Sequence, residues 1–221
     1  MRANTNTTSI HRLRDGSTIR CRPLRDSDRA KLLDGFEHFS PDSRYRRFFT
    51  PTPRLTPSML KRLFDLDGHD RFAIGAERLR LGWVPGAGLG VARFIRLPES
   101  PDTAEIAVSI VDEAQGQGLG TILMHALAAA AHDHGIARFV AWVQPDNEAM
   151  KALVLKLDPL ARAHHEDGLV VYDFAVPGSL SLPSAGTPAR RPGAVEGFLG
   201  RCADGLRQLL PGRLPGVVTQ S

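Results

Sequence analysis

The residue types that could carry out chemistry are concentrated in residues 105–121. This segment reads EIAVSIVDEAQGQGLGT, with a glutamate at its start and three alternate glycines, Gly116, Gly118 and Gly120, at its end. A glycine-rich turn between a strand and a helix presents backbone N–H groups at the positive end of the helix dipole, which favours phosphate binding. The segment therefore predicts a phosphate cradle, with a carboxylate on the strand that leads into it.

The glycine loop differs from the two common nucleotide-binding loops. No Lys-Ser or Lys-Thr pair follows the glycines, as it would in a Walker A loop. The glycines also lack the G-x-G-x-x-G spacing of a dinucleotide site. Because tight turns often produce a glycine loop before a helix, the neighbouring segments must identify its ligand.

Glu105 is a candidate general base because it interrupts the otherwise apolar strand AEIAV. A lysine with a pKa near 10.4 is neutral in only about one molecule in 10³ at pH 7, so an amine nucleophile needs a proton acceptor. A carboxylate can take that proton directly or through a water molecule. The alternative is an ordinary exposed carboxylate on a strand.

The elements around this segment predict a mixed α/β fold with a mostly antiparallel sheet flanked by helices. Short links between 71–79, 89–97 and 104–111 predict an antiparallel meander. The apolar run FVAWV predicts a strand buried on both faces. The predicted strands are 17–24, 71–79, 89–97, 104–111, 138–143, 160–166 and 168–176, and the predicted helices are 26–39, 41–49, 58–66, 117–134 and 147–157.

Length and composition suit one domain with tails. The chain has 221 residues, of which 42% are hydrophobic. We expect a flexible lead-in at 1–16, a folded domain at 17–176, and a Pro/Gly-rich linker with a candidate amphipathic helix at 177–221. No apolar run approaches the roughly 20 residues that cross a bilayer, and no secretory apolar region is seen at the N-terminus. Cys21 and Cys202 lie in different settings, which fits a reducing cytoplasm.

The charge pattern and the remaining polar clusters favour neither nucleic acid nor a metal. Residues 1–62 carry 14 Lys and Arg against 6 Asp and Glu, and this basic region could attract a polyanion. Aromatic residues make up only 6%, however, and no RNA-binding or zinc-finger motif is present. The run His164-His165-Glu166-Asp167 is more typical of a solvated turn than of a metal site, so no metal is expected.

The motif Gln115-x-x-Gly118-x-Gly120 matches the Q/R-x-x-G-x-G/A motif of the GNAT family, the Gcn5-related N-acetyltransferases. The flanking elements resemble that family in order, namely the strand before the loop, the Ala/Leu helix, the strand FVAWV and the helix that Asn147 opens. The resemblance covers about 17–176. The segments SPDSRYRRFF and AEIAV resemble most the branch that includes bacterial protein-lysine acetyltransferases.

The resemblance implies the GNAT acyl-CoA N-acyltransferase fold, with acetyl-CoA as co-substrate. It implies that the loop amides bind the CoA pyrophosphate, that the strand before the loop pairs with the pantetheine arm, and that Asn147 lies near the thioester. In the protein-acetylating branch, a glutamate at the position of Glu105 is the proposed base. The implied cofactor-binding residues are Ser109, Ile110, Val111, Gln115, Gly116, Gln117, Gly118, Leu119, Gly120, Thr121, Asn147 and Met150.

The chain departs from the family pattern at Val154. Many members carry there a tyrosine that is proposed to protonate the departing thiolate, and their Gly-Phe helix ending is Asp158-Pro159 here. The departure bears on the general acid and not on the cofactor. A thiolate that leaves unassisted is chemically tolerable, because a thiol is already a fair leaving group.

The resemblance thus implies direct acetyl transfer to a primary amine, with a protein lysine as the first acceptor to consider. Two alternatives stay open. One is an acetyltransferase of small-molecule amines, and the other is a non-catalytic acyl-CoA-binding regulator in which Glu105 is incidental. The oligomeric state is also open.

Overall fold

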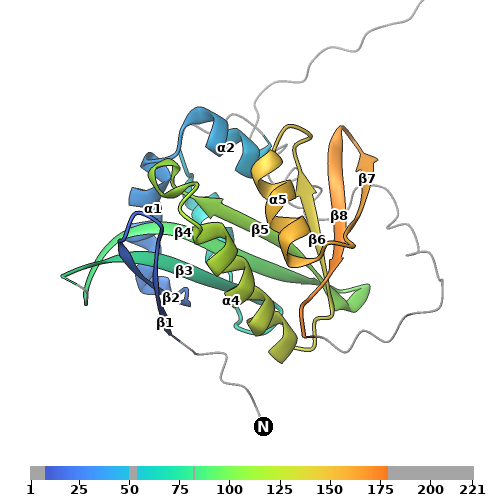
Figure 1. The fold of residues 1–221 in the computed structure, drawn as a ribbon, viewed down its shortest axis with the longest axis horizontal. Helices are drawn as coiled ribbons and strands as arrows, with labels where there is room; N and C mark the ends of the chain where they lie inside the picture. Colours follow the sequence, from blue (N-terminus) through green and yellow to red (C-terminus); the bar gives the residue numbers. More distant parts are fainter. Residues whose placement is uncertain (1–7, 50–53, 82, 179–221) are drawn as a thin grey trace, which may run out of the picture. The chain divides into compact units, whose positions relative to one another are not determined.

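The structure is a computed structural model that describes residues 8–49, 54–81 and 83–178. Within these residues, eight strands form one sheet in the order β1-β2-β3-β4-β5-β6-β8-β7 (Figure 1). The strands are β1 (Ser9–Arg12), β2 (Thr18–Pro23), β3 (Arg71–Arg80), β4 (Val84–Leu97), β5 (Ser100–Ile110), β6 (Arg138–Val143), β7 (Arg162–Glu166) and β8 (Leu169–Ala175). The helices are α1 (Arg29–Glu37), α2 (Pro41–Phe48), α3 (Pro57–Leu63), α4 (Leu119–Asp133) and α5 (Glu148–Leu157), with short 3-10 turns η1 (Asp26–Asp28) and η2 (Asp112–Ala114).

The sheet confirms the predicted mixed fold. Strands β3, β4 and β5 form the expected antiparallel meander. Strands β5 and β6 are the one parallel pair in the described sheet, and they pair only from Thr103–Arg138 to Glu105–Val140. Beyond Glu105, β5 runs on to the glycine loop without β6 beside it. The sheet therefore opens next to the residues that the sequence singled out.

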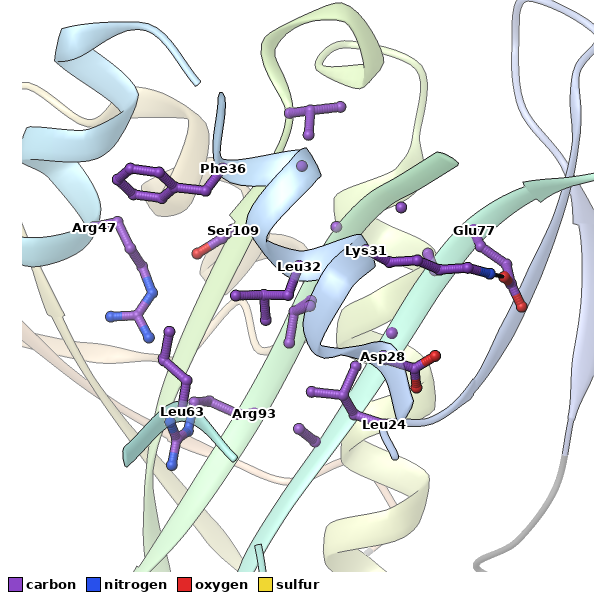
Figure 2. A pocket seen from close by; sticks show the side chains of 18 of the residues that line it. Leu24, Asp28, Lys31, Leu32, Phe36, Arg47, Leu63, Glu77, Arg93 and Ser109 are labelled. Atoms are coloured by element: carbon purple, nitrogen blue, oxygen red, sulfur yellow. Dashed lines mark hydrogen bonds and ion pairs between the residues drawn. The ribbon is translucent and has the colours of Figure 1, made fainter. Parts of the chain in front are cut away.

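The main core lies between α4 and one face of the sheet. Leu123 of α4 is fully buried in the same cluster as Phe94 of β4 and Ile106 of β5. Because side chains alternate along a strand, Arg93 and Glu105 point to the opposite face of the sheet. Helix α1 lies over that opposite face (Figure 2). The two faces thus divide the domain into an apolar core and a side with polar groups.

The sheet is larger than the sequence pattern predicts. Part of the expected lead-in, Ser9–Arg12, is an edge strand paired with β2. Strand β4 begins at Val84 and not at 89, because the segment with Pro85 pairs only with β3 and a missing N–H is tolerated there. Strand β6 was predicted to be buried on both faces, but its side chains alternate between buried and half-buried. The described residues end at Gly178, so the helix expected within 177–221 and nearly all of the linker before it lie outside them.

No helix in the described ranges is long and apolar enough to cross a membrane.

Cys21 should resist alkylation in the folded protein. Its side chain is buried in β2, and burial raises the pKa of the thiol to about 11. Because the thiolate is the nucleophile, only about one thiol in 10³ would be reactive at pH 8. In a Cys202→Ser variant, mass spectrometry should show slow iodoacetamide labelling under native conditions and fast labelling in urea. Native labelling at the rate of a free cysteine would contradict this.

Candidate functional site

The loop after β5 leaves the start of α4 without a side-chain cap. Gly116 and Gly118 have φ angles of 71° and 90°, a left-handed backbone that favours glycine. Gly118 is the N-cap residue of α4 and makes no side-chain cap hydrogen bond. The first N–H groups of a helix have no partner within the helix. The loop therefore has the geometry of an anion cradle.

Gly118 and Gly120 lack side chains for different reasons. A Cβ atom on Gly118 would meet nothing within 4 Å, so this glycine is required by its backbone angle. A Cβ atom on Gly120 would lie 2.9 Å from Cδ1 of Leu153 and 3.3 Å from Cδ1 of Ile110. Gly120 therefore lets α4 pack closely against α5 and β5. The sequence indicated a phosphate cradle but not this packing role of Gly120.

The loop is tied to the start of α2. The Gln115 side-chain amide donates to the backbone oxygen of Ile110 and to Oγ of Ser43, both at 3.2 Å. Ser43 Oγ in turn donates to Asp112 at 2.6 Å. Burial opposes ionisation of Asp112, but the hydrogen bonds from Ser43 and Ser40 outweigh it and lower its pKa. The SPDSRYRRFF segment thus supports the loop, which the sequence did not reveal.

The turn between β1 and β2 brings a cation to the same loop. The backbone N–H of Arg14 donates to the oxygen of Gln117 at 3.2 Å. Its guanidinium Nη1 donates to the oxygen of Gly116, also at 3.2 Å. The sequence did not indicate this contact, because residues 1–16 were expected to form a flexible lead-in. The signal was Asp15-Gly16, a hairpin turn pair.

Two other predicted cofactor residues have clear structural roles. Asn147 is the N-cap of α5, and its side-chain oxygen accepts the backbone N–H of Met150 at 3.1 Å. Met150 packs against the core.

Ser109 and Ile110 lie on the part of β5 that has left β6, followed by Val111. The strand edge there is available to a ligand that pairs with main-chain groups.

Glu105 is buried, with 8% of its surface exposed. This excludes the alternative of an ordinary exposed strand carboxylate. Glu105 lies opposite Ile95, and Arg93 lies opposite Ala107, so Arg93 and Glu105 are diagonal neighbours on one face of the sheet. Arg93 is also buried, with 5% exposed. A carboxylate and a guanidinium therefore share the face covered by α1, where the parallel pairing ends.

A cavity of about 100 Å³ lies between α1 and strands β3, β4 and β5 (Figure 2). Ala107 and Ser109 of β5 line its floor, together with Ala73 and Gly75 of β3. The apolar side chains around it are Leu24, Leu32, Phe36, Phe39, Phe48, Leu55 and Leu63. Arg47 and Arg93 also line it, on the side away from Glu77 (Figure 2). The cavity is thus largely apolar, with charged groups at its ends.

A charged network closes the end of the cavity at β2 and β3. Glu77 is buried and accepts hydrogen bonds from Lys31, from Arg20 at 2.7 Å and from Arg22 at 3.3 Å. Arg22 also holds Asp28 through two hydrogen bonds of 2.7 Å. Hydrogen bonding to Arg22 is the main cause of the lowered pKa of Asp28. Glu77 is 46 to 57 residues away in sequence from its three partners, so no local pattern indicated this network.

The remaining polar clusters have structural explanations. Arg46 pairs with Asp42 at 2.8 Å and with Asp146 at 3.3 Å, as expected for a charged helix face. The His134 ring packs against Phe72 and other aromatic rings at the end of α4. Among the described residues, no group of three or more His, Cys, Asp or Glu could hold a metal ion.

Comparisons with known proteins agree with this geometry. A family profile for the acetyltransferase (GNAT) domain matches residues 19–158. Acetyltransferase Pat of Mycolicibacterium smegmatis is 32% identical over 171 residues, which are 77% of this chain and 50% of that protein. The chain therefore spans about half the length of this relative.

Two solved structures show the same fold. The crystal structure of the GNAT domain of S. lividans PAT is 32% identical, with a TM-score of 0.67, and the match covers 76% of this chain and 96% of that chain. A Salmonella typhimurium structure with its cofactor acetyl-CoA is 18% identical, with a TM-score of 0.58 and coverage of 76% and 99%. The profile match, which extends over most of the described sheet, shows that the chain belongs to the GNAT acetyltransferase family.

Proposed function

We propose that the protein is an N-acetyltransferase that moves an acetyl group from acetyl-CoA to a primary amine, with a protein lysine as the acceptor. The observation that carries this proposal is the buried carboxylate of Glu105 at the point where β5 leaves β6. The same strand continues to an uncapped helix start that suits a phosphate. One strand thus joins a proton acceptor to a cofactor loop.

The residues present fit acetyl-CoA. The first backbone N–H groups of α4, beginning at Leu119, would bind the pyrophosphate, and the helix dipole favours the negative charge. The main chain of Ser109 to Val111 would pair with the pantetheine arm as an added strand would. Gln115 would hold the loop in place through its bonds to Ile110 and Ser43.

The reaction follows from this arrangement. The neutral amine nitrogen attacks the thioester carbonyl carbon, an amide C–N bond forms, and the C–S bond breaks. Glu105 accepts the proton that the amine loses. Val154 is completely buried and has no proton to donate, so solvent protonates the departing thiolate. The products are the acetylated amine and CoA.

The acceptor class rests on the resemblance of 40–49 and 104–108 to the protein-acetylating branch. The direct experiment is acetyl-CoA turnover against a panel of lysine-containing proteins and small amines, measured as thiol release. We expect turnover with lysine proteins and its loss in Glu105→Gln. Turnover with small amines alone would reassign the acceptor. Tight CoA binding with no thiol release across the panel would point to a non-catalytic regulator.

Arg14 should contribute to cofactor affinity. Its guanidinium lies against Gly116 and would add a charge-assisted contact to a phosphate in the loop. Loss of a hydrogen bond to a charged group typically costs about 1.5–3 kcal/mol, so Arg14→Ala should raise the Kd for CoA by about tenfold or more. Isothermal titration calorimetry measures this change. Arg14→Lys keeps the charge and should recover part of the affinity, whereas an unchanged Kd in Arg14→Ala would contradict the assignment.

A further inference from the structure

The cavity beneath α1 lies on the same side of the sheet as Glu105. Side chains at alternate positions of a strand share a face, so Glu105, Ala107 and Ser109 of β5 point the same way. Ala107 and Ser109 line the cavity floor, and Glu105 is the next residue along that face. The cavity therefore begins within one strand repeat of the proposed base.

We propose that this cavity holds the acyl chain of donors longer than acetyl-CoA, so that the protein transfers short-chain acyl groups such as propionyl and butyryl. The inference rests on the proposed function, because it uses the same cofactor position. With the pantetheine arm paired along Ser109 to Val111, the thioester carbon lies near Ala107 and Glu105. The second and later carbons of an acyl group would then enter the cavity across its floor.

The lining of the cavity suits an uncharged, apolar occupant. Leucine and phenylalanine side chains surround it, and small residues of the sheet, Ala73, Gly75 and Ala107, leave the space open. Its acidic groups are already paired, since Glu77 is held by Lys31 and Arg20. Burial of each CH₂ group in such a space should tighten binding by about fourfold.

The dimensions of the cavity limit the length of the chain. A benzene molecule occupies engineered cavities of about 150 Å³, so a space of about 100 Å³ admits roughly three or four carbon atoms. The floor extends along β3 from Ala73 to Glu77, about 13 Å at 3.3 Å per residue. A butyryl chain fits within this space, whereas a decanoyl chain exceeds it.

The acceptor is a poorer occupant of the same cavity. A protein lysine would enter with its amine first, and the carboxylates at the far end, Glu77 and Asp28, are already paired with Lys31 and Arg22, so they offer its ammonium group no free partner. To react, the lysine nitrogen must also lie next to Glu105. No part of the lysine side chain would then extend past Glu105 to fill the cavity.

The test compares acetyl-, propionyl-, butyryl-, hexanoyl- and decanoyl-CoA with one lysine acceptor. We expect wild-type kcat/KM values for propionyl- and butyryl-CoA within tenfold of the acetyl-CoA value, with decanoyl-CoA at least a hundredfold lower. Ala73→Leu should lower the butyryl-to-acetyl ratio at least tenfold, because one methylene group in an apolar pocket changes kcat/KM by about 10–200-fold. Leu32→Ala removes a side chain of α1 that lines the cavity, so it should raise kcat/KM for hexanoyl-CoA. A misfolded variant cannot give such a gain.

Three results would overturn the proposal. The first is a wild-type kcat/KM for butyryl-CoA more than a hundredfold below that for acetyl-CoA. The second is an unchanged butyryl-to-acetyl ratio in Ala73→Leu. The third is an equal fall of kcat/KM with every donor in Ala73→Leu, together with a raised KM for the acceptor. The last result would assign the cavity to the acceptor. If no donor is turned over, the proposed activity fails, but the role of the cavity can still be tested by measuring the affinity for acyl-CoA donors. Butyryl-CoA should bind more tightly than acetyl-CoA in wild type but not in Ala73→Leu, and equal affinities in wild type would overturn the inference.

Discussion

Glu105→Gln should lower kcat/KM for lysine acetylation at pH 7 by about 10²–10⁴-fold, the usual contribution of a general base. Glutamine has nearly the shape of glutamate but cannot accept the amine proton. Above about pH 10 the lysine ammonium group loses its proton to solvent without a base, so the deficit of the variant should shrink there. The measurement is a pH profile of kcat/KM for wild type and variant with one lysine peptide.

Two controls separate this role from a structural one. Glu99→Gln removes an exposed carboxylate from the turn before β5 and should leave the profile unchanged. CoA affinity of Glu105→Gln should match that of wild type, because the loop is not altered. A loss that is the same at neutral and at high pH would show that Glu105 does not act by taking a proton.

Glu77→Ala should lower the free energy of unfolding by about 2–3 kcal/mol. The Glu77 side chain is 6% exposed and balances Arg20, Arg22 and Lys31, which the variant leaves without their shared carboxylate. Removing one partner of a buried ion pair costs about 3–5 kcal/mol. We expect less here because Arg20 and Lys31 are 28% and 36% exposed and solvent screens them.

Urea denaturation measures this loss, and an exposed pair gives the matched control. Asp26 pairs with Arg29, but the Asp26 side chain is 75% exposed. Asp26→Ala should therefore change stability much less than Glu77→Ala does, because solvent screens an exposed pair. Equal losses in Glu77→Ala and Asp26→Ala would mean that burial of the network contributes nothing.

The same network predicts the direction of the pH dependence. Burial opposes ionisation of Glu77, but hydrogen bonds from Lys31 and Arg20 outweigh it, so its pKa lies below the ordinary value of a glutamate. The folded state then binds fewer protons than the unfolded state at acidic pH. The stabilisation is complete above the unfolded pKa and is lost as the pH falls through it toward the folded value. Glu77→Gln should flatten stability against pH below about pH 5, and an unchanged slope would contradict this.

The sequence was most informative where the local pattern and the tertiary environment agree. The meander from β3 to β5 and the helices α4 and α5 were predicted because their apolar spacing matches the core they face. Strand β1 was missed because Ser9–Arg12 is a short, polar edge strand, and β2 is its one strand partner among the described residues. The early start of β4 was missed because Pro85 and Gly86 are typical of turns, and only the long hairpin with β3 accommodates them.

The candidate site was predictable in its loop and less so in its surroundings. The spacing of Gln115, Gly118 and Gly120 predicted a glycine loop before a helix, which the structure has, and Glu105 stood out as a polar residue in an apolar strand. Neither the contact of Arg14 with the loop nor the second role of Gly120 follows from local spacing, because each depends on a partner distant in sequence. The cavity beneath α1 likewise arises from small residues on separate strands.

The early separation of β5 from β6 has a consequence for the lifetime of the protein. An unpaired strand edge inside a sheet invites the addition of another chain, a route to aggregation. If the pantetheine arm covers this edge, a hundredfold excess of CoA over its Kd adds about 2.7 kcal/mol to the stability of the fold. The abundance of the protein in a cell would then follow the supply of its own substrate, and starvation for CoA would expose it to proteolysis.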